Sequence, residues 1–156
     1  MAGIKIEGAQ EIQEALLSLP DKVSKKFMAK ALRKGAEPVL AQAKATCPVA
    51  KYTARGYSTK KEHRVKNEKG KMVGSYIRVK PGYGRDQLNI STSQRDGETR
   101  AIVGTGDAYY LNMQEWGTEK MKPHPFLAKA LETKAPEATE RIAAELKKNI
   151  EAEAFK

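Results

Sequence analysis

The stretch AYYLNMQEWGTEKMKPHPFLAKAL, residues 108–131, carries the strongest structural signals in this chain. An apolar segment with two tyrosines runs into Glu115-Trp116-Gly117-Thr118, and a polar connector leads to Pro123-His124-Pro125-Phe126-Leu127. Glycine adopts a positive φ at no steric cost, so Gly117 is expected to turn the chain sharply. Prolines keep the residues before them out of the helical region, and Pro125 suits a first helical position. The stretch therefore predicts a stiff connection between a sheet edge and a long helix.

That helix is expected to be anchored in a core from its first turn. Phe126, Leu127, Ala130 and Leu131 lie three and four residues apart, which places them on one face. The stripe continues at every fourth residue through Ala138, Ile142, Leu146 and Ile150. Pro136 predicts a kink in this helix.

Two more helices are predicted before this region. Residues 9–19 carry apolar side chains at helical spacing, and Asp21 after Pro20 is expected to cap a longer second helix that ends by Cys47-Pro48. Gly35 and Pro38 are expected to bend or split that second helix.

Strand patterns follow between the helices. Residues 73–79 alternate with period two, residues 88–93 form a weaker strand, and residues 99–104 form a third after an Arg95-Asp96-Gly97 turn. The segment at 109–116 is expected to extend the sheet or to add a short helix. The prediction is an α+β fold with N-terminal helices and a long C-terminal helix packed on a small antiparallel sheet. Residues 1–156 are expected to form a single domain. The basic insert at about 49–71 is expected to be flexible, as a mobile loop or an irregular hairpin.

The formal net charge of +10 is the strongest compositional bias. Within the insert only Glu62 and Glu68 oppose eight basic residues, which are Lys51, Arg55, Lys60, Lys61, Arg64, Lys66, Lys69 and Lys71. This charge fits an acidic protein partner, nucleic acid or an anionic surface. No stretch approaches the roughly 20 apolar residues that a membrane span needs, so a soluble protein made in the cytosol is expected.

The sequence offers little material for catalysis or metal binding. Cys47 is the only cysteine, and His63 and His124 lie far from it in the chain, so no metal, cofactor or enzymatic activity is expected. Cys47 and His63 could form a nucleophile pair, but the interpretation of Cys47 as a small packed residue is favoured. Residues 104–107, Gly-Thr-Gly-Asp, favour a tight turn over a phosphate loop. Four tyrosines could stack on bases or seal the margin of the core, namely Tyr52, Tyr57, Tyr76 and Tyr83.

The opening stretch resembles the signature of the bacteriophage head-tail joining and tail-completion family of lambdoid long-tailed phages. The matching residues are Tyr109, Tyr110, Glu115, Trp116, Gly117, Thr118, Pro123, Pro125, Phe126, Leu127, Ala130 and Leu131. The N-terminal half agrees as well, through residues 4–8, the helix end at Leu19-Pro20 and Ala36-Glu37-Pro38-Val39. The chain departs from the family pattern after Pro48, where residues 49–53 lead into the long basic insert.

The resemblance implies a structural virion protein that forms a ring, a hexamer, at the head-tail joint. Its partners would be other copies of itself and the neighbouring head-connector and tail-tube proteins, with nonspecific DNA contact as a further possibility and no membrane contact. Its place would be the virion, after assembly from the host cytoplasm. Trp116 then has two interpretations, filler between sheet and helix or anchor at a subunit interface. The alternative function is a small basic nucleic-acid-binding protein.

Overall fold

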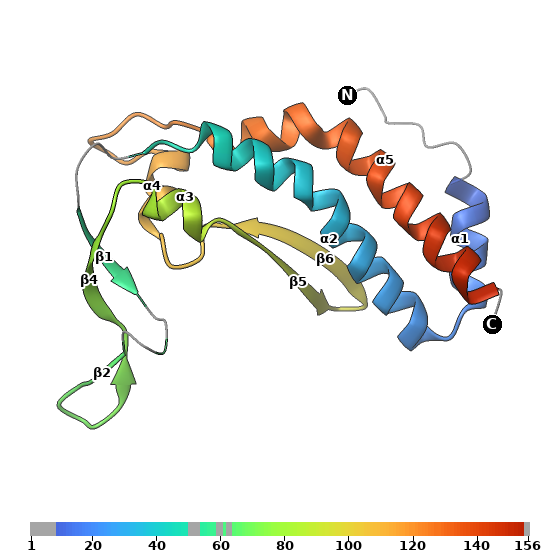
Figure 1. The fold of residues 1–156 in the computed structure, drawn as a ribbon, viewed down its shortest axis with the longest axis horizontal. Coiled ribbons are helices and arrows are strands. Elements are labelled where there is room, and N and C mark those ends of the chain that lie inside the picture. Colours follow the sequence, from blue (N-terminus) through green and yellow to red (C-terminus); the bar gives the residue numbers. More distant parts are fainter. Residues whose placement is uncertain (1–8, 50–53, 59–60, 62–63, 155–156) are drawn as a thin grey trace.

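The computed structural model describes residues 9–49, 54–58, 61 and 64–154. The helices are α1 (Ala9–Ser18), α2 (Asp21–Thr46), α3 (Tyr83–Gln87), α4 (Tyr110–Trp116) and α5 (Phe126–Ala154). The strands are β1 (Ala54–Ser58), β2 (Val65–Lys66), β3 (Met72–Val73), β4 (Ser75–Val79), β5 (Asn89–Arg95) and β6 (Glu98–Gly104). The predicted α+β class is confirmed, with N-terminal helices, small antiparallel sheets and a long C-terminal helix (Figure 1).

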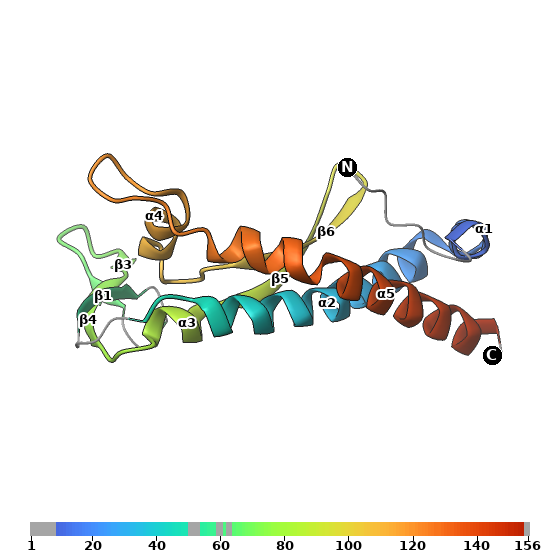
Figure 2. The same ribbon diagram turned by 90° about the horizontal axis from the view of Figure 1, so that it is seen from above.

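Helices α2 and α5 lie side by side along most of their length and form the main helical layer (Figures 1 and 2). Gly35 permits their close approach, because a Cβ there would meet the Ile142 side chain and lie 2.8 Å from the carbonyl oxygen of Ala138. Further along, Lys30 Nζ lies 2.9 Å from Glu145 Oε1 and donates a hydrogen bond of 2.8 Å to Asn149 Oδ1. The two helices are thereby held together at two neighbouring points, by packing at Gly35 and by charge and hydrogen bonding at Lys30.

The hairpin β5–β6 covers one side of this layer and packs mainly against α2. The predicted turn is confirmed, and it consists of Asp96 and Gly97, which both have positive φ, 55° and 79°, while Arg95 pairs with Glu98. The core lies where the hairpin, α2, α4 and the start of α5 meet. It contains Val39, Ala43, Cys47, Leu88, Ala108, Leu111, Phe126, Ala130 and Ala138.

The strands β1, β4, β2 and β3 form an arm that projects beyond the ends of the two long helices (Figures 1 and 2). Strand β1 pairs antiparallel with β4, and β2 pairs with β3. The predicted strand at residues 73–79 is therefore broken at Gly74 into β3 and β4. Part of the predicted flexible insert is regular strand, namely β1 and β2, while residues 50–53, 59–60 and 62–63 lie outside the described part.

Two predictions about helix boundaries are wrong. Gly35 and Pro38 do not split α2, which is continuous from Asp21 to Thr46. Pro136 lies inside the continuous helix α5, and the predicted bend of α2 and kink of α5 stay predictions. Pro38 is buried, so packing offsets the hydrogen bond that proline cannot donate. Asp21 is the first residue of α2 rather than its cap, since Pro20 holds the cap position without a side-chain hydrogen bond. The short helix α3 was not predicted.

Candidate functional site

Glu115 at the end of α4 anchors the start of α5. Its carboxylate accepts three backbone hydrogen bonds, from Phe126 at 2.8 Å and Leu127 at 2.9 Å through Oε2, and from Ala128 at 2.8 Å through Oε1. The first N–H groups of a helix have no partner within that helix, and negative charge is favourable beside them. Glu115 is 4% exposed, so these donors are satisfied away from bulk water.

The chain between Glu115 and α5 is held in a defined loop. Gly117 has φ 77°, as predicted, and a Cβ at this position would lie 2.8 Å from the carbonyl oxygen of Met121. Thr118 and Met121 exchange backbone hydrogen bonds of 2.9 and 3.1 Å. The His124 amide donates a bond of 2.6 Å to the carbonyl oxygen of Gln114. The predicted stiff connection exists, but it joins the short helix α4 to α5 rather than a sheet edge to a helix.

Trp116 points into solvent from this rigid element. Its side chain is 79% exposed, although the residue on its N-terminal side is buried. The interpretation of Trp116 as filler between sheet and helix is therefore wrong. The remaining interpretation, an exposed anchor for an interface, is compatible with this placement. Leu131 was also expected on the buried face of α5, yet it is 57% exposed.

The other residues of the signature occupy the two sides of this element. Tyr109 is half exposed, and its ring meets that of Tyr110 edge to face with centroids 6.3 Å apart. Tyr110 packs against α3, where a Cβ on Gly84 would lie 2.7 Å from the tyrosine hydroxyl. Burial raises the pKa of Tyr110. Pro123 and Pro125 flank the exposed His124 in the loop, and α5 begins directly after Pro125.

An apolar groove of about 550 Å³ opens beside Trp116. One wall is β6, at Ala101, Ile102 and Val103, and the other wall is α5, at Leu127 and Leu131. The floor comes from α2, including Leu32 and Val39. Trp116 and Leu131 are both substantially exposed, so the groove presents apolar side chains to water. Surfaces of this kind commonly mark interaction sites. Ile102 is also exposed, but its side chain alternates with those of Ala101 and Val103 and so points to the other face of β6.

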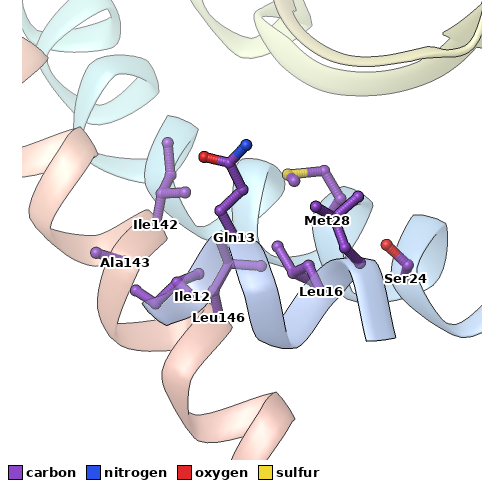
Figure 3. A pocket seen from close by; sticks show the side chains of 9 residues that line it. Ile12, Gln13, Leu16, Ser24, Met28, Ile142, Ala143 and Leu146 are labelled. Atoms are coloured by element: carbon purple, nitrogen blue, oxygen red, sulfur yellow. The ribbon is translucent and has the colours of Figure 1, made fainter. Parts of the chain in front are cut away.

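A second apolar cavity of about 380 Å³ lies between α1 and the helical layer (Figure 3). Ile12 and Leu16 of α1 face Met28 of α2 and Leu146 of α5 across it. Leu17, in the same helix, is 77% exposed. The cavity is where the short helix α1 attaches to the body of the protein.

The predicted basic docking residues lie on the arm or outside the described part. Lys66, Lys69 and Lys71 are exposed on the β2–β3 hairpin, and Lys61 and Arg64 are exposed just before it. Arg55 lies in β1. Lys51 and Lys60 are not among the described residues. The arm carries further exposed charge at Arg78 and Lys80, which the sequence analysis did not include.

Of the two candidates for catalysis, only Cys47 lies among the described residues. Cys47 is buried at the end of α2, where burial raises the pKa of its thiol, and its Sγ lies 3.7 Å from the Pro48 carbonyl oxygen. Its suggested partner His63 lies outside the described residues. Within the described ranges there is no group of three or more acidic, histidine or cysteine side chains that could hold a metal ion. No described helix is long and apolar enough to cross a membrane.

The capping role of Glu115 was missed from the sequence, although a signal existed. The residues before α5 are Pro123, His124 and Pro125, none of which is a preferred cap. Buried backbone donors must find acceptors somewhere, so an uncapped buried helix start predicts a distant acceptor. The nearest buried carboxylate upstream is Glu115.

The sequence was compared with known protein families. Residues 10–117 match the family described as "Bacteriophage HK97-gp10, putative tail-component". The chain belongs to this family. The match runs from α1 through α4 and ends at Gly117, so it includes Glu115 and Trp116 but not α5. Neither the curated proteins nor the solved structures contain a match to this chain. Membership makes the HK97-gp10-like chain a structural component of a bacteriophage tail, and hence of the virion.

Proposed function

We propose that this tail component forms a ring of identical subunits at the joint between the phage head and the tail, as a tail-completion or head-tail connecting protein. The observation that carries the proposal is Trp116, an aromatic side chain held in solvent by a buried, hydrogen-bonded backbone element. Tryptophan is strongly enriched among the residues that dominate binding energy at protein interfaces. A fixed backbone also lowers the entropy lost when such a side chain is buried by a partner.

The arm supplies a second, chemically different surface for the same role. Lys66, Lys69, Lys71, Arg78 and Lys80 are exposed on it, and a ring repeats this charge around its axis. We propose that the arm faces an acidic surface on the neighbouring head-connector or tail-tube protein. Such charges mainly set the rate and specificity of docking. The same basic side chains could instead contact the phosphates of DNA that passes through the ring, and the charge-reversal experiment below distinguishes the two partners.

Complementation of a phage that lacks this gene tests the subunit contact. Trp116→Ala is expected to stay folded, because the side chain is exposed, and to reduce infectious particles at least about tenfold, the loss that a hot spot implies. Leu17→Ala is the matched control, since Leu17 is equally exposed at the other end of the molecule. Filled heads and finished tails should accumulate unjoined with Trp116→Ala only. Normal infectivity of the Trp116→Ala phage would contradict the proposal.

A triple charge reversal tests the arm separately. Lys66, Lys69 and Lys71 changed to Glu should leave the melting temperature unchanged and prevent joining, because exposed charges add little stability. The control reverses three exposed lysines on the helices, Lys22, Lys26 and Lys147. If the arm variant still assembles but loses salt-sensitive DNA binding, the arm contacts DNA and the proposed protein partner is wrong.

A further inference from the structure

The helical layer is only partly covered, and the uncovered part is the groove. Two helices side by side present a face about 20 Å wide, since each is about 10 Å across with its side chains. The β5–β6 hairpin covers about 10 Å of it, because neighbouring strands lie about 4.8 Å apart. The hairpin packs on α2, which leaves Leu127 and Leu131 of α5 facing the groove. Roughly two further strands would be needed to complete the layer.

The strand beside the groove has a free edge. Among the described strands β6 pairs only with β5. Arg95 and Glu98 close the two-residue turn, so Glu98, Arg100 and Ile102 point their backbone N–H and C=O groups toward β5. Thr99, Ala101 and Val103 alternate with them and point these groups away. Ala101 and Val103 line the groove. An open strand edge therefore runs along an apolar surface.

The same chain carries a two-stranded sheet, β1 and β4 of the arm, that could supply the missing strands. In the arm, β4 has one neighbour among the described strands, which is β1, and none of the other described strands pairs with its second edge. In the sequence of β3 and β4 every second residue, namely Val73, Ser75, Ile77 and Val79, falls on one face, and three of these four are apolar, a pattern typical of a strand with one face on a core. The arm projects beyond the ends of the two long helices α2 and α5 (Figure 1).

We propose that β4 of a second copy adds to the free edge of β6 and covers the apolar groove. The sheet then runs β5, β6, β4 and β1, the last two from the neighbouring copy, and spans both α2 and α5. Edge addition of this kind is a common mode of recognition, in which backbone bonds give affinity and alternate side chains enter pockets. The contact joins different surfaces on the two copies, so it repeats from copy to copy and can close into a ring. It deepens the proposed function, since it names the contact that the ring would repeat.

Disulfide trapping between copies tests this pairing, in a Cys47→Ala background that leaves no native thiol. Arg78 on β4 and Ile102 on β6 are both exposed and would lie on the outer face of the joined sheet. Protein with Arg78→Cys mixed with protein with Ile102→Cys should form a disulfide-linked pair about tenfold faster than a mixture with Lys69→Cys, because docking raises the local thiol concentration. Lys69 lies on the same arm but outside β4, which makes it a matched control. Because the register between β4 and β6 is not known in advance, the experiment is repeated with Tyr76→Cys in place of Arg78→Cys and with Arg100→Cys in place of Ile102→Cys.

The outcomes separate this inference from the proposed ring. Rings seen by electron microscopy without any of these β4–β6 cross-links would overturn strand addition and leave the proposed function intact. Cross-linked chains that never join heads to tails would support strand addition and contradict the role at the joint. A disulfide formed by Ile102→Cys protein alone would show symmetric β6–β6 pairing, and a protein that stays monomeric at every concentration would show that no second copy occupies the groove. Either result overturns the inference.

Trp116 provides a readout that needs no cross-link. It is the only tryptophan in the chain, and it borders the groove. Its fluorescence should shift to the blue as copies associate, because β4 of the neighbour excludes water from the indole. Ala101→Pro removes a backbone donor from the free edge while the bonds to β5 remain. This variant should keep its circular dichroism spectrum and lose the shift, and a full shift in the folded variant would speak against pairing at this edge.

Discussion

Replacing Glu115 by alanine should destabilise the protein by about 3 kcal/mol. The carboxylate accepts bonds of 2.8, 2.9 and 2.8 Å from the first three amides of α5. Hydrogen bonds to charged groups contribute about 1.5 to 3 kcal/mol each when their loss leaves a buried partner unsatisfied. Because Glu115 also borders the groove, water can reach part of the space that alanine would leave, and we take about 1 kcal/mol for each donor.

Thermal and urea unfolding followed by circular dichroism measure this loss. For a chain of this length 1 kcal/mol lowers the melting temperature by about 2 to 4 °C, so Glu115→Ala should lower it by about 6 to 12 °C. Glu115→Gln keeps the shape and one acceptor oxygen but turns an amide NH₂ toward a backbone donor, and about half of the loss is expected. Glu119→Gln is the matched control, because Glu119 is exposed in the adjoining loop and should shift the midpoint by less than about 1 °C.

The result that would refute the reasoning is a Glu115→Ala protein as stable as the Glu119→Gln control. The first amides of α5 would then be satisfied by water or by a shift of the helix start, and Glu115 would not be the anchor of this element. If Glu115→Ala impaired only assembly and left the unfolding midpoint unchanged, Glu115 would contribute to a subunit interface and not to the stability of the fold.

Three further predictions concern the helical layer and the thiol. Gly35→Ala should destabilise the protein by about 1 to 3 kcal/mol through overpacking of the α2–α5 contact, whereas Gly104→Ala, which has open space around its Cβ position, should change urea stability by less than about 0.5 kcal/mol. The hydrogen bond and charge of Lys30 lower the pKa of Glu145 in the folded protein. Lys30→Met should therefore destabilise the protein above pH about 4.3, the pKa of an unperturbed glutamate, and this difference from the wild type should disappear as the pH falls through the lower folded-state pKa. Urea unfolding of both proteins at a series of pH values measures the difference. Burial raises the pKa of Cys47, so native protein should react with iodoacetamide far more slowly than urea-unfolded protein, and equal rates would contradict the packed position of this thiol.

The helices and the β5–β6 hairpin could be predicted because their signals are local. Apolar spacing gave α1, α2 and α5 to within a few residues, and Asp96-Gly97 gave the turn. The errors arose where tertiary packing overrides local preference. Pro38 would break an isolated helix, but it is buried in the pair that α2 forms with α5, and the packing holds the helix together.

The candidate site was less predictable, since its geometry depends on contacts across the chain. Glu115, Trp116 and Gly117 could be recognised as one motif from the sequence, but the burial of Glu115 and the exposure of Trp116 could not be predicted. Burial of one and exposure of the next depends on how α4 meets α5, and no periodicity within seven residues of helix reports this. For residues 49–71 a mobile loop and an irregular hairpin both stayed open for a similar reason, because the pairing of β1 with β4 is set by long-range contact and not by a turn motif.

The position of Trp116 is tied to the stability of the core by the residue that precedes it. The Glu115 carboxylate holds the end of α4 on the start of α5, where Phe126 and Ala130 are buried. A change that loosens the start of α5 therefore also releases the backbone that presents Trp116 to a partner. The two sets of variants can distinguish this coupling, since Trp116→Ala should impair joining at full stability while Glu115→Ala should impair both. If Glu115→Ala protein, kept folded at low temperature, joined heads to tails normally, the interface would not need a rigid Trp116, and the anchoring of this element would serve the fold alone.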